Sequence, residues 1–210
     1  MTQGASGFQQ VISSEQELRD ILGYPSEVVN RKVVSAIDSH CKDYIARSPF
    51  VLIATADGEG KCDVSPRGDA PGFVLVLDEQ RLVIPERPGN RRMDSLRNIV
   101  SNPNIGLIFL IPGLEETLRV NGKAYVIKDE ALLNQMQAHG KAPLLGIGVE
   151  VEECYMHCAK AFKRSMLWNP ESWLDKDELP VPARILAKHT GSTEEQITRS
   201  LDESYRLRLY

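Results

Sequence analysis

Two adjacent arginines, Arg91 and Arg92, follow a Pro-Gly-Asn turn that comes after the short apolar stretch Leu82–Pro85. We expect a helix to begin at these arginines. The free amides of a helix's first turn carry partial positive charge and attract anions. Guanidinium groups there would oppose the helix dipole, unless an anion binds between them. Their forked donors suit a phosphate, and Asn90 or Ser95 could add a hydrogen bond. The pattern predicts a phosphate-binding corner; a solvated basic helix start is the alternative.

A second candidate site lies where a strand is expected to end at Val64 and Ser65. The following loop, Pro66–Gly72, carries one cation (Arg67), one anion (Asp69) and two glycines. Glycines let a backbone approach a ligand closely, and functional residues are often found on such loops. A plain turn explains the same residues equally well.

The third candidate is the polar face of an alternating stretch, 117–127. Its apolar residues should face one way, while Thr117, Arg119 and Asn121 face the other. A planar ligand with carbonyl and ring-nitrogen atoms could bind to such a row. A solvent-facing side of the strand is the alternative, and spacing alone favours it.

The fourth candidate, Glu153–Trp168, contains Cys154, His157 and Cys158 at a spacing that suggests zinc. Structural zinc sites use two separated ligand pairs, and no second pair matches, so no metal site is predicted. A thiol nucleophile has no better support, because chain neighbours rarely form the required hydrogen bond. The roles of these three residues stay open. The rest of the segment could contact an anion or an aromatic ring through Lys160, Arg164, Ser165 and Trp168.

The elements that must position these residues change in period along the chain. Helices are predicted after Ser14 and Ser26, the second with an apolar stripe from Val29 to Ile45. Strands are then expected at 50–55, 61–65, 73–77, 82–84, 105–111, 117–127 and around 147–151, with helices at 91–101 and 129–138 and two more at the C-terminus. Inserted rather than alternating helices argue against a parallel sheet. The pattern predicts a mainly β, α+β protein with an antiparallel barrel or strongly bent sheet.

The expected organisation is one domain with appendages: an N-terminal helical extension (1–48), a β domain (49–170) and a C-terminal helical extension (171–210). The net charge of −4 and the pI near 5.6 argue against a general nucleic-acid binder. There is no apolar run of about 20 residues and no signal-peptide pattern. We therefore expect a cytoplasmic protein without a membrane partner. Its four cysteines should be reduced. Rossmann, Walker and nucleophile-elbow motifs are absent.

Several segments together resemble the pyridoxamine 5'-phosphate oxidase-like family of FMN-binding split barrels. The order and spacing of these segments carry the resemblance: Val64–Asp69, Arg81–Pro85, Gly89–Arg92, Asn98–Pro103, Ile105–Phe109 and Leu118–Ala124. The segments His157–Ala161 and Arg164–Trp168 resemble an uncharacterised flavin-nucleotide-binding subgroup. The resemblance covers about residues 45–170.

The resemblance implies an antiparallel six-stranded split barrel that works as a homodimer, with FMN between the subunits. It places the FMN phosphate at the start of the short helix, with Asn90, Arg91, Arg92 and Ser95. It places the isoalloxazine ring near Val64, Ser65, Arg67, Ile84 and Pro85, with Thr117 and Arg119 approaching from the long hairpin. Lys160, Arg164, Ser165 and Trp168 would come from the other subunit.

The function that the resemblance implies is an FMN-dependent oxidoreductase. It would move a hydride or electrons between a reduced nicotinamide or small organic substrate and an acceptor. The catalytic residues are unknown, although Arg67 could stabilise negative charge on reduced flavin. The tail Tyr205–Tyr210 does not reproduce the family's arginine-rich substrate signature, so the flavin site carries over and the substrate does not. A non-catalytic flavin carrier or sensor, or a split barrel that binds haem or a deazaflavin, are the alternatives.

Overall fold

The structure, a computed structural model, describes residues 7–210, and the chain divides into two compact units, Met1–Val33 and Val34–Tyr210. The first unit contains α1 (Glu15–Leu22) and α2 (Glu27–Arg31). As predicted, α1 follows Ser14, whose side chain accepts a hydrogen bond from the Glu17 amide at 3.2 Å. This bond satisfies one of the amides that a helix start leaves without an intrahelical partner.

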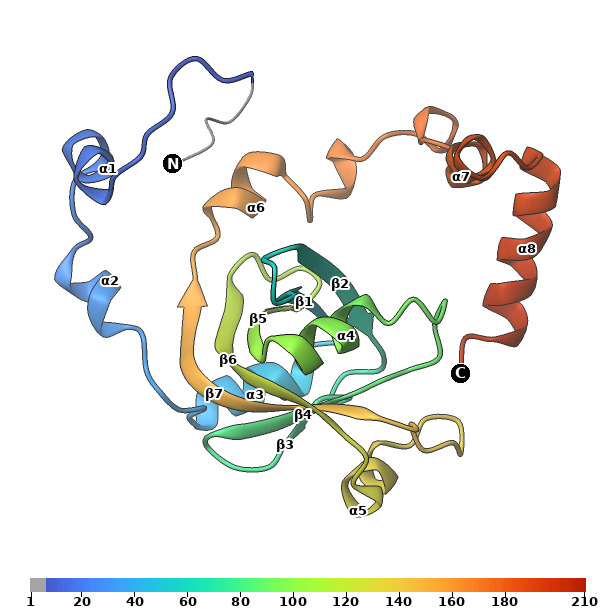
Figure 1. The fold of residues 1–210 in the computed structure, drawn as a ribbon, viewed down its shortest axis with the longest axis horizontal. Helices are drawn as coiled ribbons and strands as arrows, with labels where there is room; N and C mark the ends of the chain where they lie inside the picture. The colour runs from blue at the N-terminus through green and yellow to red at the C-terminus, as the bar shows by residue number, and fades with distance from the viewer. Residues whose placement is uncertain (1–6) are drawn as a thin grey trace. The chain divides into compact units, whose positions relative to one another are not determined.

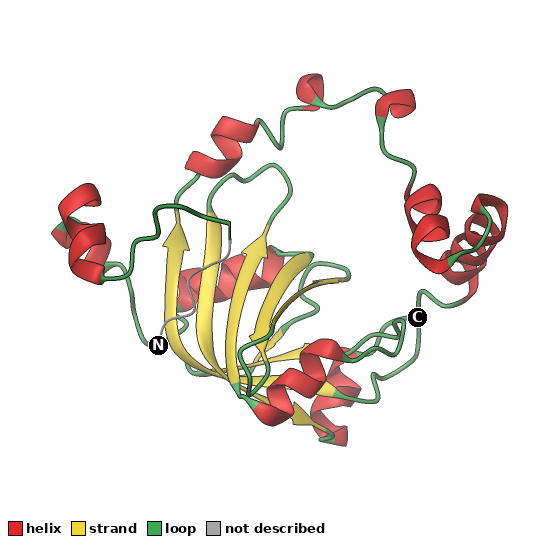
Figure 2. Cartoon of the chain, turned by 45° about the horizontal axis from the view of Figure 1, so that its top comes forward, coloured by secondary structure: helices red, strands yellow, loops and turns green. Residues whose placement is uncertain are grey.

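The second unit is built on one antiparallel sheet with the strand order β2-β1-β5-β6-β7-β4-β3 (Figure 1). The strands lie in a single strongly curved sheet (Figure 2). Its strands are β1 (Phe50–Ala56), β2 (Cys62–Gly68), β3 (Leu75–Val76), β4 (Arg81–Pro85), β5 (Asn104–Leu110), β6 (Thr117–Ile127) and β7 (Gly146–His157). Its helices are α3 (Ser39–Arg47), α4 (Asp94–Ser101), α5 (Glu130–Leu133), α6 (Lys160–Ser165), α7 (Pro182–Thr190) and α8 (Glu194–Leu207), with 3-10 turns at Asn134–Met136, Pro170–Ser172 and Lys176–Glu178.

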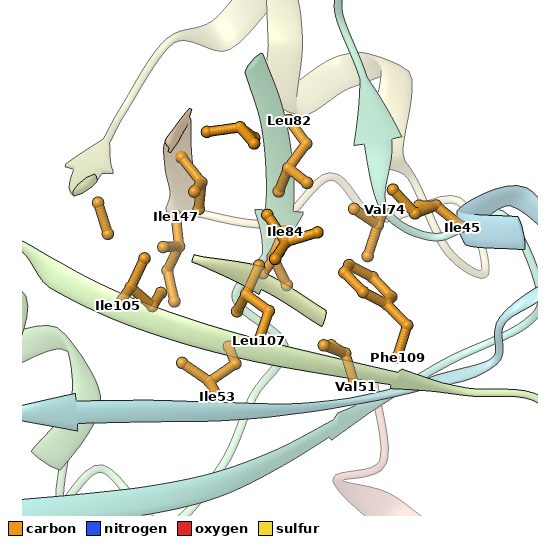
Figure 3. Close-up of a cluster of buried hydrophobic side chains, with 14 of the residues drawn as sticks. Ile45, Val51, Ile53, Val74, Leu82, Ile84, Ile105, Leu107, Phe109 and Ile147 are labelled. Carbon is orange, nitrogen blue, oxygen red and sulfur yellow. The ribbon is translucent and has the colours of Figure 1, made fainter. Parts of the chain in front are cut away.

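The predicted α+β class with an antiparallel, bent sheet is confirmed. The sheet has seven strands where the resemblance implied six, because the two-residue strand β3 pairs with β4 at one edge. The predicted alternation also holds: Ile147, Val149 and Val151 on β7 are 0%, 2% and 7% exposed. Inward-facing residues of the strands form the core together with Ile45 from α3 (Figure 3). Burying each such side chain contributes about 1.5–3 kcal/mol.

Two predicted elements are divided or shortened. The apolar stripe from Val29 to Ile45 does not form one helix, because Val34 makes a β-bridge with Cys154 and Asp38 caps a separate helix, α3. The strand expected at 73–77 is reduced to the two residues of β3. Phe73 is buried in the core instead of pairing along a strand, and its amide bonds back to the Ala70 carbonyl in a turn.

Two boundaries near the candidate site also differ from the prediction. β2 continues to Gly68, so Pro66 and Arg67 lie in a strand and not in a loop. An edge strand tolerates a proline, because the amide it lacks is not needed on the open side. The helix expected from Arg91 begins only at Asp94, since Arg91 and Met93 have left-handed backbone angles (φ 63° and 58°) that a helix cannot include.

Tyr44 on α3 makes stability depend on pH at alkaline values. Its hydroxyl donates to the Glu116 carbonyl at 2.8 Å, and burial together with the nearby Glu116 charge raises the pKa of Tyr44 to about 12. Because the unfolded chain ionises this group near pH 10, the folded state is favoured below pH 10 and loses that advantage as the pH rises to 12. We expect a loss of about 2 kcal/mol in the free energy of unfolding.

Chemical denaturation of the protein and of Tyr44→Phe at several values between pH 8 and 12 would measure this loss. Phenylalanine has no proton to lose, while all other ionisable groups are common to both proteins. The stability advantage of the natural protein over the variant should therefore shrink above pH 10. Parallel pH profiles would show that Tyr44 is not the responsible group.

Candidate functional site

Two ion pairs join the end of β2 to the segment that follows β4. Arg67 Nη1 lies 2.9 Å from Glu86 Oε1, and Arg87 Nε lies 2.7 Å from Asp69 Oδ2. Since β2 is one edge of the sheet and β4 lies next to the other edge, these pairs link the two sides of the curved sheet. We call these four residues the ion-pair seam. Sequence analysis singled out Arg67 and Asp69 but missed both partners, Glu86 and Arg87.

The Arg67–Glu86 pair is mostly withdrawn from water, with side chains 19% and 21% exposed. Arg67 Nε and Glu86 Oε2 are buried and have no hydrogen-bond partner among the described residues. Buried polar atoms are usually satisfied in proteins, so these two are an exception that a water or a ligand group could resolve. Glu86 also compensates the positive charge of Arg67, which reduces what this arginine could offer to a negatively charged ligand.

The start of α4 presents several hydrogen-bond donors. Met93, the N-cap residue, provides no side-chain hydrogen bond to the first-turn amides. Arg91 and Arg92 are exposed in the loop just before the helix. Arg92 Nε lies 2.8 Å from Asp94 Oδ2, and the Arg92 amide donates to Asn90 Oδ1 at 3.0 Å. An uncapped helix start next to two guanidinium groups has the donor set that a phosphate requires, although Asp94 already engages one of them.

Hydrogen bonds hold this end of α4 against the sheet. Ser95 is buried, and its hydroxyl donates to Asp63 Oδ2 on β2 at 2.9 Å. One turn later, Asn98 Nδ2 donates to Thr55 Oγ1 on β1 at 3.0 Å. Ser95 therefore positions the helix start, and its hydroxyl is already committed to Asp63. Asp63, Thr55 and Asn98 had not been singled out from the sequence.

The structure brings the predicted residues of β2, β4 and α4 into one region. Ser65 and Arg67 lie on the inner face of β2, as does Asp63, which bonds to Ser95. Ile84 and Pro85 directly precede Glu86, the partner of Arg67. The Ile84 side chain is completely buried in the core. It therefore supports this region through packing and does not form part of its surface.

The remaining predicted residues of the sheet lie on its opposite, outer face. Val64 faces outward on β2 and is 62% exposed, and Arg119 faces outward on β6. Arg119 Nη1 donates a hydrogen bond to the Tyr155 hydroxyl oxygen at 3.1 Å. Thr117, at the start of β6, is only 3% exposed. β1 and β5 separate β2 from β6, a distance of roughly 14 Å at the usual strand spacing.

The residues of the fourth candidate form a third group beyond the end of β7. Lys160, Arg164 and Ser165 are exposed on α6, and the Ser165 hydroxyl donates to the Phe162 carbonyl. Trp168 stacks on the Phe162 ring, with centroids 5.7 Å apart, and its Nε1 donates to the Leu114 carbonyl at 3.0 Å. Within residues 7–210, these contacts join Ser165 and Trp168 to Phe162 and Leu114, and none of them reaches the start of α4.

The cysteine-rich part of this segment lies on a strand. Cys154 is completely buried, and this burial is the main reason that the pKa of its thiol lies well above the usual value. Buried thiols of high pKa are unreactive, so Cys154 belongs to the core. No cluster of three or more potential metal ligands occurs within residues 7–210. In the same part of the chain, no helix has both the length and the apolar character needed to cross a bilayer.

The fold is therefore of the α+β class. It consists of a curved antiparallel sheet, with two arginines at a helix start beside the ion-paired strand β2. Residues 37–158, more than half of the chain, match the model of the pyridoxamine 5'-phosphate oxidase family. The chain belongs to this family, as the sequence resemblance implied. No curated protein sequence matches the chain.

Solved structures of similar fold have low sequence identity. HupZ of Group A Streptococcus is 20% identical, over 57% of this chain and 93% of its own, with a TM-score of 0.48. HutZ, described as the heme storage protein of Vibrio cholerae, is 14% identical over 58% and 93%, with a TM-score of 0.41. An F420 reductase is 18% identical over 55% and 94%, with a TM-score of 0.39. None of these likenesses assigns a ligand to this chain.

Proposed function

We propose that this protein binds FMN and acts as an FMN-dependent oxidoreductase. The observation that carries the proposal is the uncapped start of α4, flanked by Arg91 and Arg92, in a member of the pyridoxamine 5'-phosphate oxidase family. FMN, when bound, supplies hydride and electron exchange between a reduced nicotinamide or small organic substrate and an acceptor. The protein supplies position, charge and control of access.

The proposed roles follow from what each residue already contacts. Arg91 has the free guanidinium and would be the principal phosphate donor, together with the first-turn amides of α4. Arg92 would join it by leaving Asp94, whose pKa it now holds below the usual value through their hydrogen bond. Ser95 keeps the helix start in place through Asp63. The unsatisfied Arg67 Nε would donate to a polar edge of the ligand, while Glu86 fixes the guanidinium.

We propose a homodimer as the working state, because both arginines face solvent in a single chain and a groove needs a second wall. The outer face of the sheet supports this choice. Leu52, Ile108 and Leu110 lie there in neighbouring strands, partly exposed, next to Arg119. A second copy on this face would cover that apolar surface, and the sequence resemblance assigns Lys160 and Arg164 of that copy to the cofactor. Light scattering of the purified protein would measure the mass in solution.

Replacing both arginines with alanine (Arg91→Ala, Arg92→Ala) should weaken FMN binding about thirtyfold, since charge-assisted hydrogen bonds to a phosphate would be lost. Titration followed by flavin fluorescence measures the dissociation constant. Riboflavin, which lacks the phosphate, should bind the natural protein more weakly than FMN does, and this difference should shrink in the double variant, which keeps only the first-turn amides of α4.

A matched control is Arg47→Ala, because Arg47 is also exposed and paired with an aspartate, Asp43, but lies on α3. It should bind FMN as the natural protein does. Equal affinity of the double variant and the natural protein for FMN would refute the phosphate assignment.

The same preparation separates the alternative functions. Reduction of bound FMN by NADH or NADPH and reoxidation by an acceptor support an oxidoreductase. Tight FMN binding without either step indicates a carrier or sensor. An absorption spectrum typical of haem or of a deazaflavin in the protein as isolated would replace FMN with that cofactor.

A further inference from the structure

The C-terminal helices α7 and α8 pack mainly against each other. Ala183 and Ala187 on α7 are 6% and 8% exposed, and Arg184 on α7 pairs with Glu194 on α8 at 3.1 Å. Other apolar residues of the two helices stay exposed, Ile185 and Leu207 among them. Figure 1 shows the orange-to-red arm that leaves the sheet after β7 and ends beyond α8. Such a helical pair has little core of its own, so its position depends on anchoring contacts.

Tyr210 supplies an anchor of this kind through three contacts. Its hydroxyl donates to Asp69 Oδ1 at 2.9 Å. Its ring lies beside the His139 imidazole, with centroids 4.2 Å apart and planes tilted by 44°. Lys141 Nζ donates to its main-chain oxygen at 3.1 Å. These contacts come from two separate loops, 69–73 and 135–141. Residues 69–73 and 135–139 of these loops line a cavity of about 340 Å³, and Tyr210 lines it as well. We call Asp69, His139 and Lys141 the Tyr210 socket.

The Asp69 carboxylate, which accepts the hydrogen bond from Tyr210, is held in place by other contacts. Its side chain is only 6% exposed, and it is held by Arg87 Nε at 2.7 Å and by the Ala70 amide at 2.8 Å. Burial by itself would raise the pKa of Asp69, but the hydrogen bonds from Ala70 and Tyr210 and the Arg87 charge outweigh it and lower the pKa. The carboxylate is thus ionised and fixed, and hydrogen bonds to a charged acceptor are about twice as strong as neutral ones.

We propose that the socket is a docking site for the tyrosine side chain at position 210, and that Tyr210 of the same chain, bound there, tethers α7 and α8 to the sheet. The socket shares Asp69 with the ion-pair seam, in which Asp69 pairs with Arg87, and Asp69 and Arg67 are two residues apart. Docking therefore also restrains the two segments that carry the Arg67–Glu86 pair. The tether needs no cofactor, so it stands apart from the proposed FMN function.

Hydrogen exchange of the full chain, measured by mass spectrometry, tests the tether. Tyr210→Phe removes only the hydroxyl and should make peptides from loops 69–73 and 135–141 exchange about tenfold faster, because the charge-assisted bond to Asp69 is lost. Tyr210→Ala should add faster exchange in α7 and α8. The control Tyr205→Phe changes the same type of residue at an exposed position on α8 and should alter none of these rates.

A double-mutant cycle identifies the partner. If Tyr210 acts through Asp69, Tyr210→Phe should have no further effect on loop exchange in an Asp69→Asn background. Natural exchange rates in Tyr210→Phe and Tyr210→Ala would overturn the proposal. So would loop protection that disappears on dilution of the natural protein, since the bound tyrosine would then belong to a second copy.

Discussion

Replacing Gly122 with alanine should unfold the protein or cost about 4 kcal/mol or more of stability, an exceptional effect for one methyl group. Gly122 lies in β6 where the register with β7 shifts. A Cβ atom there would come 1.9 Å from the Glu150 carbonyl oxygen and 2.9 Å from its carbon. These are main-chain atoms of the neighbouring strand, so no side-chain rotation can relieve the overlap. The two longest strands of the sheet would have to separate.

Urea denaturation of the soluble protein measures this effect. Gly58→Ala is the matched control, because Gly58 lies in the turn between β1 and β2 and a Cβ there meets nothing within 4 Å. Its stability should stay within about 0.5 kcal/mol of the natural protein. A Gly122→Ala protein that unfolds cooperatively within 1 kcal/mol of the natural one would contradict the close approach of β6 to β7.

The second large effect is expected at the ion-pair seam. Arg67→Ala should lower the free energy of unfolding by about 3 kcal/mol, since it leaves the Glu86 carboxylate largely buried without its partner. The desolvation penalty of the remaining charge, more than the lost attraction, sets the magnitude. Removing both charges (Arg67→Ala with Glu86→Ala) should therefore cost less than Arg67→Ala alone.

A surface pair provides the comparison. Arg81 and Asp78 also form an ion pair, with Arg81 Nη2 2.6 Å from Asp78 Oδ2, but their side chains are 60% and 41% exposed. Arg81→Ala should change stability by less than about 1 kcal/mol, because water screens and solvates the partner that stays. Equal losses for Arg67→Ala and Arg81→Ala in urea denaturation would show that burial of the seam does not matter. If the double variant is less stable than Arg67→Ala, the unpaired Glu86 carboxylate is not the main cause of the lost stability.

The sequence by itself determined the class of fold, because the relevant signals are local. Alternation along 117–127 and at 147–151 identified the inner faces of β6 and β7, since neighbouring side chains of a strand point to opposite sides. Ser14 predicted the start of α1 through the hydrogen bond that a short side chain offers to a helix amide. The position of Arg91 and Arg92 next to a helix start was also predicted, within three residues.

The exact start of α4 could not be predicted. Arg91 and Met93 adopt left-handed backbone angles that are uncommon outside glycine, and their residue types do not predict this conformation. The strand at Pro66 was also missed, because a proline is compatible with a strand only at a sheet edge. Which strand forms the edge depends on the pairing of the whole sheet.

Only the tertiary structure decided which residues share a site. Arg67 meets Glu86 across 19 positions and Asp69 meets Tyr210 across 141, since sheet curvature and the returning C-terminal arm bring them together. Sequence periodicity reports which way a side chain faces on its own element. It does not report which other element lies opposite, because that depends on long-range register and on the curvature of the sheet.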